Sequence, residues 1–308
     1  MKNTYSVGLI TYNYLDRFRE CISHIPNMKG KPFVVVNDGI PYESKEYRDD
    51  MIVLQHATNK KIAISKNDAL RYLLTYDTEW IFIMENDMKI LDSAVFDYYI
   101  EVANKSGLRH LNFALHGKDN WNEERTDVAP RLIYDNGISL YNYAGGCFQL
   151  YHRSIFDKVG LYDEFYKNCW EHLDMTYRTT LAGFHTPFWL SADVNNSHHY
   201  LEQIDYKEQS DVSSKDINPN YYEGLFYWKF KFGSWVANIP EWINETYHTN
   251  IVMEMFQERR YEELSKLFMN YYRNEQSPFF NTEYKYGNVY DNVWGKVDDS
   301  GNLMIFHN

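Results

Sequence analysis

The first 90 residues alternate between short apolar runs and longer amphipathic stretches. This alternation is typical of a sheet whose strands are joined by crossover helices. Ligands in such sheets collect beyond the carboxyl ends of the strands, where Asp38 and residues 85–87 fall here. The pattern predicts strands at 5–11, 32–39, 51–55 and 80–84, and helices at 14–25 and 64–76.

The rest of the chain continues this pattern and then changes character. After Tyr200 the sequence becomes polar and rich in Tyr and Trp, and a helical pattern follows at 251–273. We expect a mixed α/β sheet flanked by helices over 1–205 and a smaller, mainly helical extension over 206–308. Between 90 and 200 we expect helices at 96–105, 155–160 and 171–182, strands at 111–115 and 143–151, and a polar loop at 117–130.

Charge and cysteine content restrict the class of protein. A formal net charge of −12 disfavours nucleic-acid binding, because neutralising phosphates needs clustered Lys and Arg. Cys21, Cys147 and Cys169 form no CxxC pair, which indicates a reducing compartment without a disulfide framework. No apolar run approaches the ~20 residues of a membrane helix, so we expect a cytoplasmic protein without a transmembrane segment. Aromatic residues make up 18% of the chain and supply flat surfaces that suit sugar rings.

An acidic triplet, Glu85, Asn86 and Asp87, follows the strand predicted at 80–84. Side chains alternate along a strand, so both carboxylates face the same side. Their hard oxygen atoms suit Mg²⁺ or Mn²⁺, and such a metal bridges a diphosphate and stabilises it as a leaving group. Taken alone, the triplet is also compatible with a solvated acidic turn.

Three motifs together resemble family-2 glycosyltransferases of the GT-A fold. They are the turn at Asn37-Asp38-Gly39, the helix start from Asn59 to Asn67, and the triplet, which is similar to the family's Asp-x-Asp motif. Their order and spacing carry the resemblance over about residues 5–200. It implies a Rossmann-like catalytic domain at 1–205 that binds a nucleotide-diphospho-sugar.

A fourth segment extends the resemblance. Gly160-Leu161-Tyr162-Asp163-Glu164-Phe165 leads to Trp170-Glu171-His172 and a closing Gly183, similar to a family segment whose helix-start carboxylate lies near the acceptor hydroxyl. The dipole of such a helix keeps a carboxylate ionised and able to accept a proton. His172 stands where the family usually has the catalytic Asp. Either His172 is the base, or Glu171 is the base and His172 orients the acceptor, or the enzyme is impaired.

The resemblance assigns further residues to the site. It implies that Asp38, with Thr11 and Asn13, contacts the base or ribose. Lys66 then approaches the diphosphate, and Asn67, Glu85 and Asn86 lie on the donor side. Gly145, Gly146 and Trp170 lie by the donor sugar or the acceptor. The metal ligands expected are Asp87, Glu85, and His199 or His198.

The function that follows is a metal-dependent glycosyltransferase with Mn²⁺ or Mg²⁺ as cofactor. The expected reaction moves a hexose from a UDP-sugar to a hydroxyl of a glycan, a lipid-linked or another acceptor, inverting by single displacement. The alternatives are a retaining enzyme, a nucleic-acid-modifying transferase, and an impaired nucleotide-sugar-binding module. Aromatic residues of the extension are expected to form an acceptor platform, a packing surface or a homo-oligomer contact. They are Tyr221, Tyr222, Phe226, Tyr227, Trp228, Trp235 and Trp242.

Overall fold

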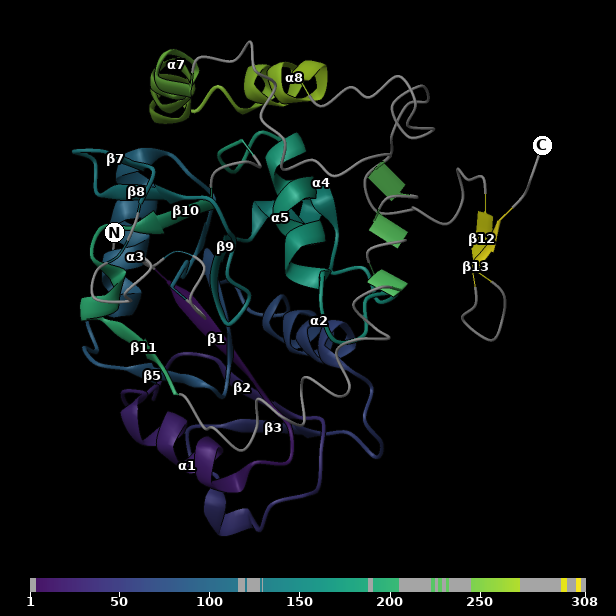
Figure 1. Ribbon diagram of the computed structural model, residues 1–308. Coiled ribbons are helices and arrows are strands. Elements are labelled where there is room, and N and C mark those ends of the chain that lie inside the picture. The colour runs from purple at the N-terminus through teal and green to yellow at the C-terminus, as the bar shows by residue number, and fades with distance from the viewer. Residues whose placement is uncertain are drawn as a thin grey trace.

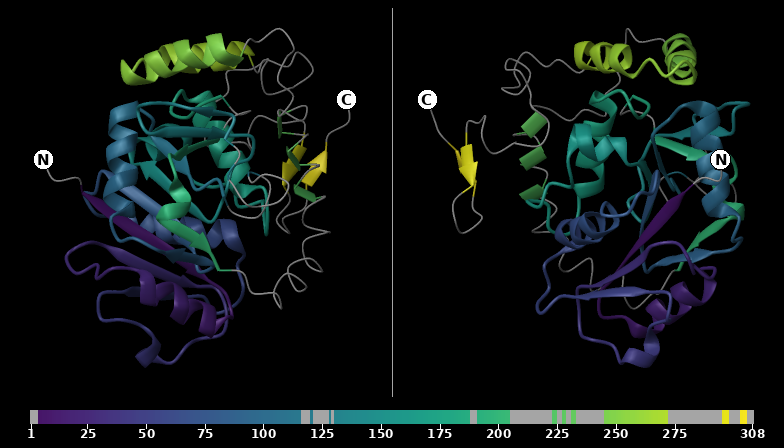
Figure 2. Two further views of the ribbon diagram at one scale, coloured as in Figure 1. Left: turned by 60° about the vertical axis from the view of Figure 1, so that its left-hand side comes forward. Right: turned by 180° about the vertical axis from the view of Figure 1, so that it is seen from behind.

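The computed structural model describes most of the first 204 residues and separate parts of the remaining chain (Figure 1). A central sheet lies between helices, and two later helices lie across one end of the molecule (Figures 1 and 2). Within the described residues, no helix combines the length and the apolar character needed to cross a membrane. The residues described are 4–115, 120, 128, 130–187, 191–204, 223–224, 227–228, 231–232, 245–271, 295–297 and 303–305.

A six-stranded sheet forms the centre, and its strands in spatial order are β3 (Ile52–Gln55), β2 (Phe33–Asn37), β1 (Tyr5–Thr11), β4 (Trp80–Glu85), β9 (Phe148–His152) and β6 (His110–Asn112). β1 to β4 run parallel, whereas β9 is antiparallel to both β4 and β6. Leu9 in β1 pairs with Val35 on one side and Met84 on the other. The carboxyl ends of β1, β2 and β4 therefore meet at one edge.

Both faces of the sheet are buried, which explains why its strands are almost continuously apolar. Val35 belongs to a buried cluster with Phe18 and Phe96 from the helices of one face. Val34 points the other way and joins a second cluster with Leu70. The first cluster involves α1 (Leu15–His24) and α3 (Val95–Ser106); the second involves α2 (Ile62–Leu73), α4 (Ser154–Val159) and part of α5 (Glu171–Leu181).

Short strands form smaller sheets, and the sequence predicts only one of these strands, which is expected to end at Ala192-Asp193. These strands have two to four residues each, too few for a periodic pattern to be recognised. One sheet has the order β10 (Ser191–Val194), β8 (Ile138–Tyr141), β7 (Leu132–Ile133); a second pairs β11 (Leu201–Gln203) with β5 (Met88–Ile90), and a third pairs β12 (Gly295–Val297) with β13 (Leu303–Ile305). Two 3-10 turns are η1 (Ser44–Glu46) and η2 (Ser197–His199).

The C-terminal helical pattern forms two helices, α7 (Glu245–Gln257) and α8 (Tyr261–Tyr271). The helical pattern expected at 251–273 is divided between these two helices. Arg259 has a left-handed backbone, with φ of 57°, and its N–H bonds to the carbonyl of Phe256, which ends α7. Gly107, which follows α3, and Gly183, which follows α5, allow α7 and α8 to pack closely against these two turns. A Cβ at Gly107 would collide with the backbone of Phe256 in α7, and a Cβ at Gly183 would collide with the backbone of Tyr261 in α8.

The mixed α/β sheet with flanking helices is confirmed. Residues after 205 share the main hydrophobic cluster with residues before it, among them Tyr227, Trp228, Phe232 and Phe256. Tyr227 and Trp228 are buried, so these two side chains form a packing surface and no acceptor platform. Tyr221, Tyr222, Phe226, Trp235 and Trp242 lie outside the described residues. The boundary near residue 205 stays a prediction.

Candidate active site

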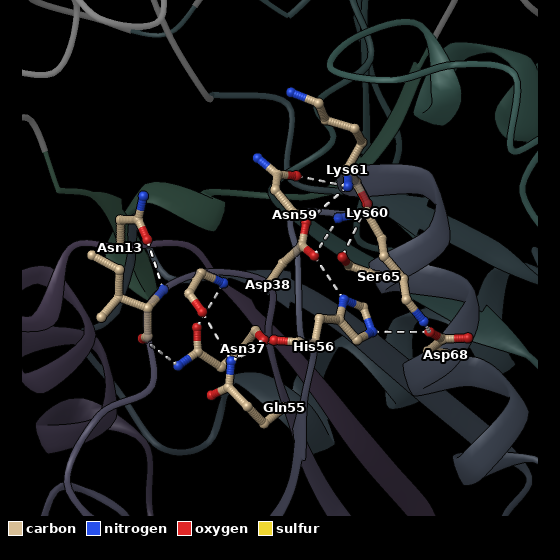
Figure 3. Close-up of polar contacts among 12 residues, drawn as sticks. Asn13, Asn37, Asp38, Gln55, His56, Asn59, Lys60, Lys61, Ser65 and Asp68 are labelled. Carbon is tan, nitrogen blue, oxygen red and sulfur yellow. Dashed lines mark hydrogen bonds and ion pairs between the residues drawn. The ribbon is translucent and has the colours of Figure 1, made fainter.

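Asp38, after β2, organises the loop that precedes α2 (Figure 3). Its Oδ1 accepts the N–H of Lys60 at 2.7 Å, and its Oδ2 accepts the N–H of Lys61 at 2.8 Å. Its Oδ1 also lies 2.7 Å from His56 Nδ1, and His56 Nε2 lies 2.9 Å from Asp68 Oδ2. Both carboxylate oxygens thus hold the chain itself, and the predicted contact of Asp38 with a base or ribose stays a prediction.

His56 has no motif to mark it, and sequence reasoning missed it. The ring is buried and lies between two carboxylates, which ties the residue after β3 to α2. The loop ends at Lys61, which has φ of 76° and ψ of 166°. A residue with a side chain rarely adopts this conformation, and the hydrogen bonds that its N–H donates to Asp38 and Asn59 compensate for the strain.

The ends of β1, β2 and β4 are joined by side-chain contacts. Asn86 Nδ2 donates to Thr11 Oγ1 at 2.9 Å, and both residues are buried. Asn13 Oδ1 accepts the N–H of Ile40 at 2.8 Å. A Cβ on Gly39 would collide with Asn13, so this tie requires glycine in the turn after β2. These predicted donor-side residues are therefore close together in the fold, with Thr11 and Asn86 bonded to one another.

Two residues predicted to contact a ligand make contacts within the fold, and their roles at the site stay predictions. Asn67 is buried, and its amide bonds in both directions to the backbone of Tyr162 and also donates to Glu164. Trp170 is also buried, and its indole packs on Trp228 with ring centroids 5.9 Å apart. Packing between distant segments decided both orientations, which helical spacing alone does not determine.

Lys66 lies at the centre of a group of titratable side chains, which we call the Lys66 cluster: the buried Lys66 and Glu171 and the half-buried Glu85 and His172. The Lys66 Nζ donates to Glu85 Oε1 at 2.8 Å, to Glu171 Oε1 at 2.9 Å, and to the carbonyl oxygen of Gly146 at 3.0 Å. The side chain is completely buried. Burial lowers the pKa of Lys66, but the two carboxylates raise it by more, so the ammonium stays charged.

Glu171 is the first residue of α5, and it is ionised in this cluster. Burial raises the pKa of its carboxyl, but Lys66 and then His172 lower it by more, to well below the ordinary range. His172 Nδ1 lies 3.3 Å from Glu171 Oε1. Glu171 Oε2 is buried and has no hydrogen-bond partner in the described part of the chain. A buried carboxylate oxygen left in this way is a strong acceptor for a ligand hydroxyl.

A pocket of about 280 Å³ opens beside the Lys66 cluster. Gly146 lets the His172 ring reach it, because a Cβ there would lie 2.7 Å from His172 Cγ. Asn120, Tyr143, Asn168 and the two cysteines were not assigned from the sequence; their place next to the Gly145-Gly146 pair and the Trp170-Glu171 motif was the available signal. The pocket is lined by Ile62, Glu85, Ala114, Asn120, Tyr143, Ala144, Gly145, Gly146, Cys147, Asn168, Cys169, Glu171 and His172.

The predicted metal ligands come only partly together. Burial raises the pKa of Glu85, and the charge of Lys66 lowers it. The negative charges of Asp87 and Glu171 raise it further, so the carboxylates of Asp87 and Glu85 interact electrostatically. His198 and His199 lie in η2, where their rings pack together at 4.3 Å. Among the described residues, no three His, Cys, Asp or Glu side chains are grouped to hold a metal ion. The carboxylates nevertheless fit a hard cation whose other ligands come from a bound diphosphate and water.

The arrangement of strands and helices is similar to that of known glycosyltransferase structures. A mannosyltransferase from Pyrobaculum calidifontis, PcManGT, solved with GDP-Man and Mn²⁺, has a TM-score of 0.51 at 9% identity and covers 88% of this chain and 75% of its own. S. aureus TarS 1-349 with UDP has a TM-score of 0.47 at 14% identity, covering 99% and 97%. GalNAc-T7 with UDP, GalNAc and Mn²⁺ has a TM-score of 0.46 at 10% identity, covering 62% and 41%.

These likenesses concern structure and not sequence. None of the known family models matches this sequence, and comparison with curated proteins finds no match. At 9% identity the likeness to PcManGT shows the fold alone. The chain has the GT-A glycosyltransferase fold, as the order of its motifs predicted.

Proposed function

We propose that this protein is a divalent-metal-dependent glycosyltransferase that moves a sugar from a nucleotide-sugar, with UDP as the expected nucleotide, to an acceptor hydroxyl. The observation that carries the proposal is the pairing of Glu171 with His172 at the wall of the pocket. There one buried carboxylate oxygen is left for a ligand. PcManGT was solved with GDP-Man and Mn²⁺, which agrees with a nucleotide-sugar and a metal as ligands of this fold.

His172 is the proton acceptor in this proposal, and Glu171 positions it. Lys66 and His172 lower the pKa of Glu171, which makes that carboxylate a weak base. The same carboxylate accepts a hydrogen bond from His172 Nδ1 when the ring carries its proton there, which leaves Nε2 to take a proton from the acceptor. The ring is 21% exposed, so an acceptor in the pocket can reach it.

Lys66 then has a different role from the expected one. Its Nζ already contacts two carboxylates and the carbonyl of Gly146. We therefore assign Lys66 to keep Glu171 ionised and aligned, in place of a direct contact with diphosphate.

The metal in this proposal is held by Asp87, with Glu85 beside it. A divalent cation there supplies the positive charge that stabilises a leaving diphosphate. Glu85 also bonds to Lys66, so it links the donor end of the site to the Glu171 end. Displacement by an acceptor activated at His172 inverts the anomeric centre, which NMR of the product tests directly.

Replacing His172 tests the base assignment. After a screen of nucleotide-sugars with Mn²⁺ has identified a donor, His172→Gln should lower kcat by about 10²- to 10⁴-fold, the usual contribution of a general base. The affinity for UDP and Mn²⁺, measured by calorimetry, should stay within about twofold of the wild-type value. The proposed nucleotide site is formed by the ends of β1, β2 and β4, whereas His172 belongs to α5. The base assignment fails if His172→Gln retains its kcat; the function itself fails if wild-type protein binds no nucleotide and turns over no donor.

A further inference from the structure

The described residues of 223–232 pack against the loop that enters the catalytic helix α5. Asp163, Phe165 and Lys167 of this loop each contact that segment. Asp163 Oδ2 accepts from Tyr227 Oη at 2.8 Å, the rings of Phe165 and Tyr227 stack at 4.0 Å, and Lys167 Nζ lies 3.1 Å from Glu223 Oε1. Contacts of three kinds therefore join two segments about 60 residues apart in the chain.

Trp170 follows this loop and packs against the same segment. Its backbone is left-handed, with φ of 78° and ψ of −16°, a conformation that is strained for a residue with a side chain. The indole is buried between Trp228 and Gly224, and a Cβ on Gly224 would lie 2.6 Å from Trp170 Cδ1. This packing holds the strained backbone in place.

The direction of the chain at Trp170 decides where the site residues point. Glu171 and His172 follow it directly, and Asn168 and Cys169, which precede it, line the same pocket. If Trp170 relaxed to an ordinary backbone conformation, the residues on both sides of it would turn away from their present positions. Displacement of a catalytic group by about 1 Å can cost about 100-fold in rate.

We propose that the described residues of 223–232 form a positioning element of the active site, which holds Trp170 so that Asn168, Cys169, Glu171 and His172 face the pocket. This inference rests on the proposed function and assigns a catalytic purpose to part of the C-terminal extension. Lys231 anchors the element, since its buried Nζ bonds to Asp163 in the loop and to Asp174 in α5. Catalytic turnover and the shape of the pocket wall depend on the packing of this element against Trp170. Nucleotide binding at the ends of β1, β2 and β4 does not depend on it.

Gly224→Ala in the full-length protein tests the inference, because its methyl group presses on the Trp170 indole. We expect kcat to fall about tenfold or more, with the affinity for UDP and Mn²⁺ unchanged within about twofold. A second measurement needs no substrate. The rate at which iodoacetamide labels Cys169, followed by peptide mass spectrometry, should rise at least about fivefold, while buried Cys21 should label as in wild type.

Gly30→Ala is a control for a general loss of stability: no heavy atom lies within 4 Å of the Cβ that it adds, but the φ of 85° at this position strains an alanine. It should change neither kcat nor the labelling of Cys169. If Gly224→Ala leaves both quantities at wild-type values, the inference is overturned. If the labelling of Cys21 rises too, the variant has unfolded. In that case Tyr227→Phe, which removes one hydrogen bond to Asp163, tests the inference by the same two measurements, kcat and the labelling of Cys169. A wild-type protein without nucleotide affinity would refute the proposed function, yet Cys169 labelling would still decide whether the segment holds Trp170.

Discussion

Lys66 and Lys231 are both completely buried, and each lies between two carboxylates. Lys231 belongs to a second group, the Lys231 cluster: Lys231, Asp163, Asp174 and Arg178. There both oxygens of each carboxylate have hydrogen-bond donors from the protein. In the Lys66 cluster, by contrast, Glu171 Oε2 is left without a partner among the described residues and the group borders a pocket.

The comparison shows that the same arrangement, a buried lysine between two carboxylates, serves two different purposes in this protein. A buried ion pair contributes little net stability on its own, but removing one partner leaves an uncompensated charge and is costly. The satisfied Lys231 cluster therefore fixes chain segments in place. The Lys66 cluster holds its groups in place and also leaves one acceptor and one imidazole facing a ligand, which is the requirement for chemistry.

The largest effect is expected for Lys66→Met. Without the ammonium, the pKa of Glu171 rises, the carboxyl becomes protonated beside Glu85, and it no longer orients His172. We expect kcat to fall about 10²- to 10⁴-fold, with UDP affinity little changed. Steady-state kinetics on protein shown to be folded by circular dichroism checks this. A kcat within threefold of wild type would contradict the role given to Lys66.

Lys231→Met should act mainly on stability. It leaves Asp163 and Asp174 buried without their common cation, which costs about 3–5 kcal/mol of unfolding free energy. The kcat of the folded fraction should fall much less than in Lys66→Met. Urea unfolding gives the first quantity and kinetics the second.

Lys158→Met is the control for that variant, because Lys158 pairs with Glu262 at the surface at 3.5 Å. The loss expected there is below about 1 kcal/mol. Equal losses for the two lysines would remove the distinction between the buried Lys231 cluster and an exposed ion pair.

Asp163→Asn should give a smaller effect than Lys231→Met, and one that depends on pH. Burial raises the pKa of Asp163, but Lys231 lowers it by more, to about 2. Because this pKa is below the unfolded value of about 3.9, the unfolded chain binds more protons between the two values. The stabilisation, about 2 kcal/mol, is complete above pH 4 to 5 and is lost as pH falls through about 2.

The measurement is the unfolding free energy of wild type and Asp163→Asn at several pH values from 3 to 6. The difference between the two proteins should shrink toward the acid end. A difference that stays constant with pH would show that Asp163 contributes through neutral contacts and not through its charge.

Much of the sheet could be predicted from local pattern. The run at 5–11 coincides with β1, and Trp80 begins β4 as expected, because β-branched and aromatic runs between turn residues favour strands. Prediction failed where local pattern is weak. Met88–Ile90 has three residues and forms a strand only by pairing with Leu201–Gln203, more than 100 positions away.

The site shows the same division. Its acidic residues and His172 could be recognised because they stand at the ends of strands or at a helix start, as the motifs require. The contact of Asn67 with Tyr162 could not be predicted, because it depends on how α2 packs against a segment 95 positions away. The burial of Trp170 could not be predicted either, because Gly224 and Trp228, which cover it, belong to a distant segment.

The sequence by itself determined the alternation of strands and helices, and with it the edge at which Asp38, Glu85 and Asp87 gather. Local periodicity and turn chemistry are properties of neighbouring residues, so they can be read along the chain. Contacts between distant segments bring Lys66 to Glu171, 105 positions away, and bring Gly224 and Trp228 against Trp170. Such contacts depend on how whole elements pack, which is the sum of many weak interactions between residues far apart in sequence.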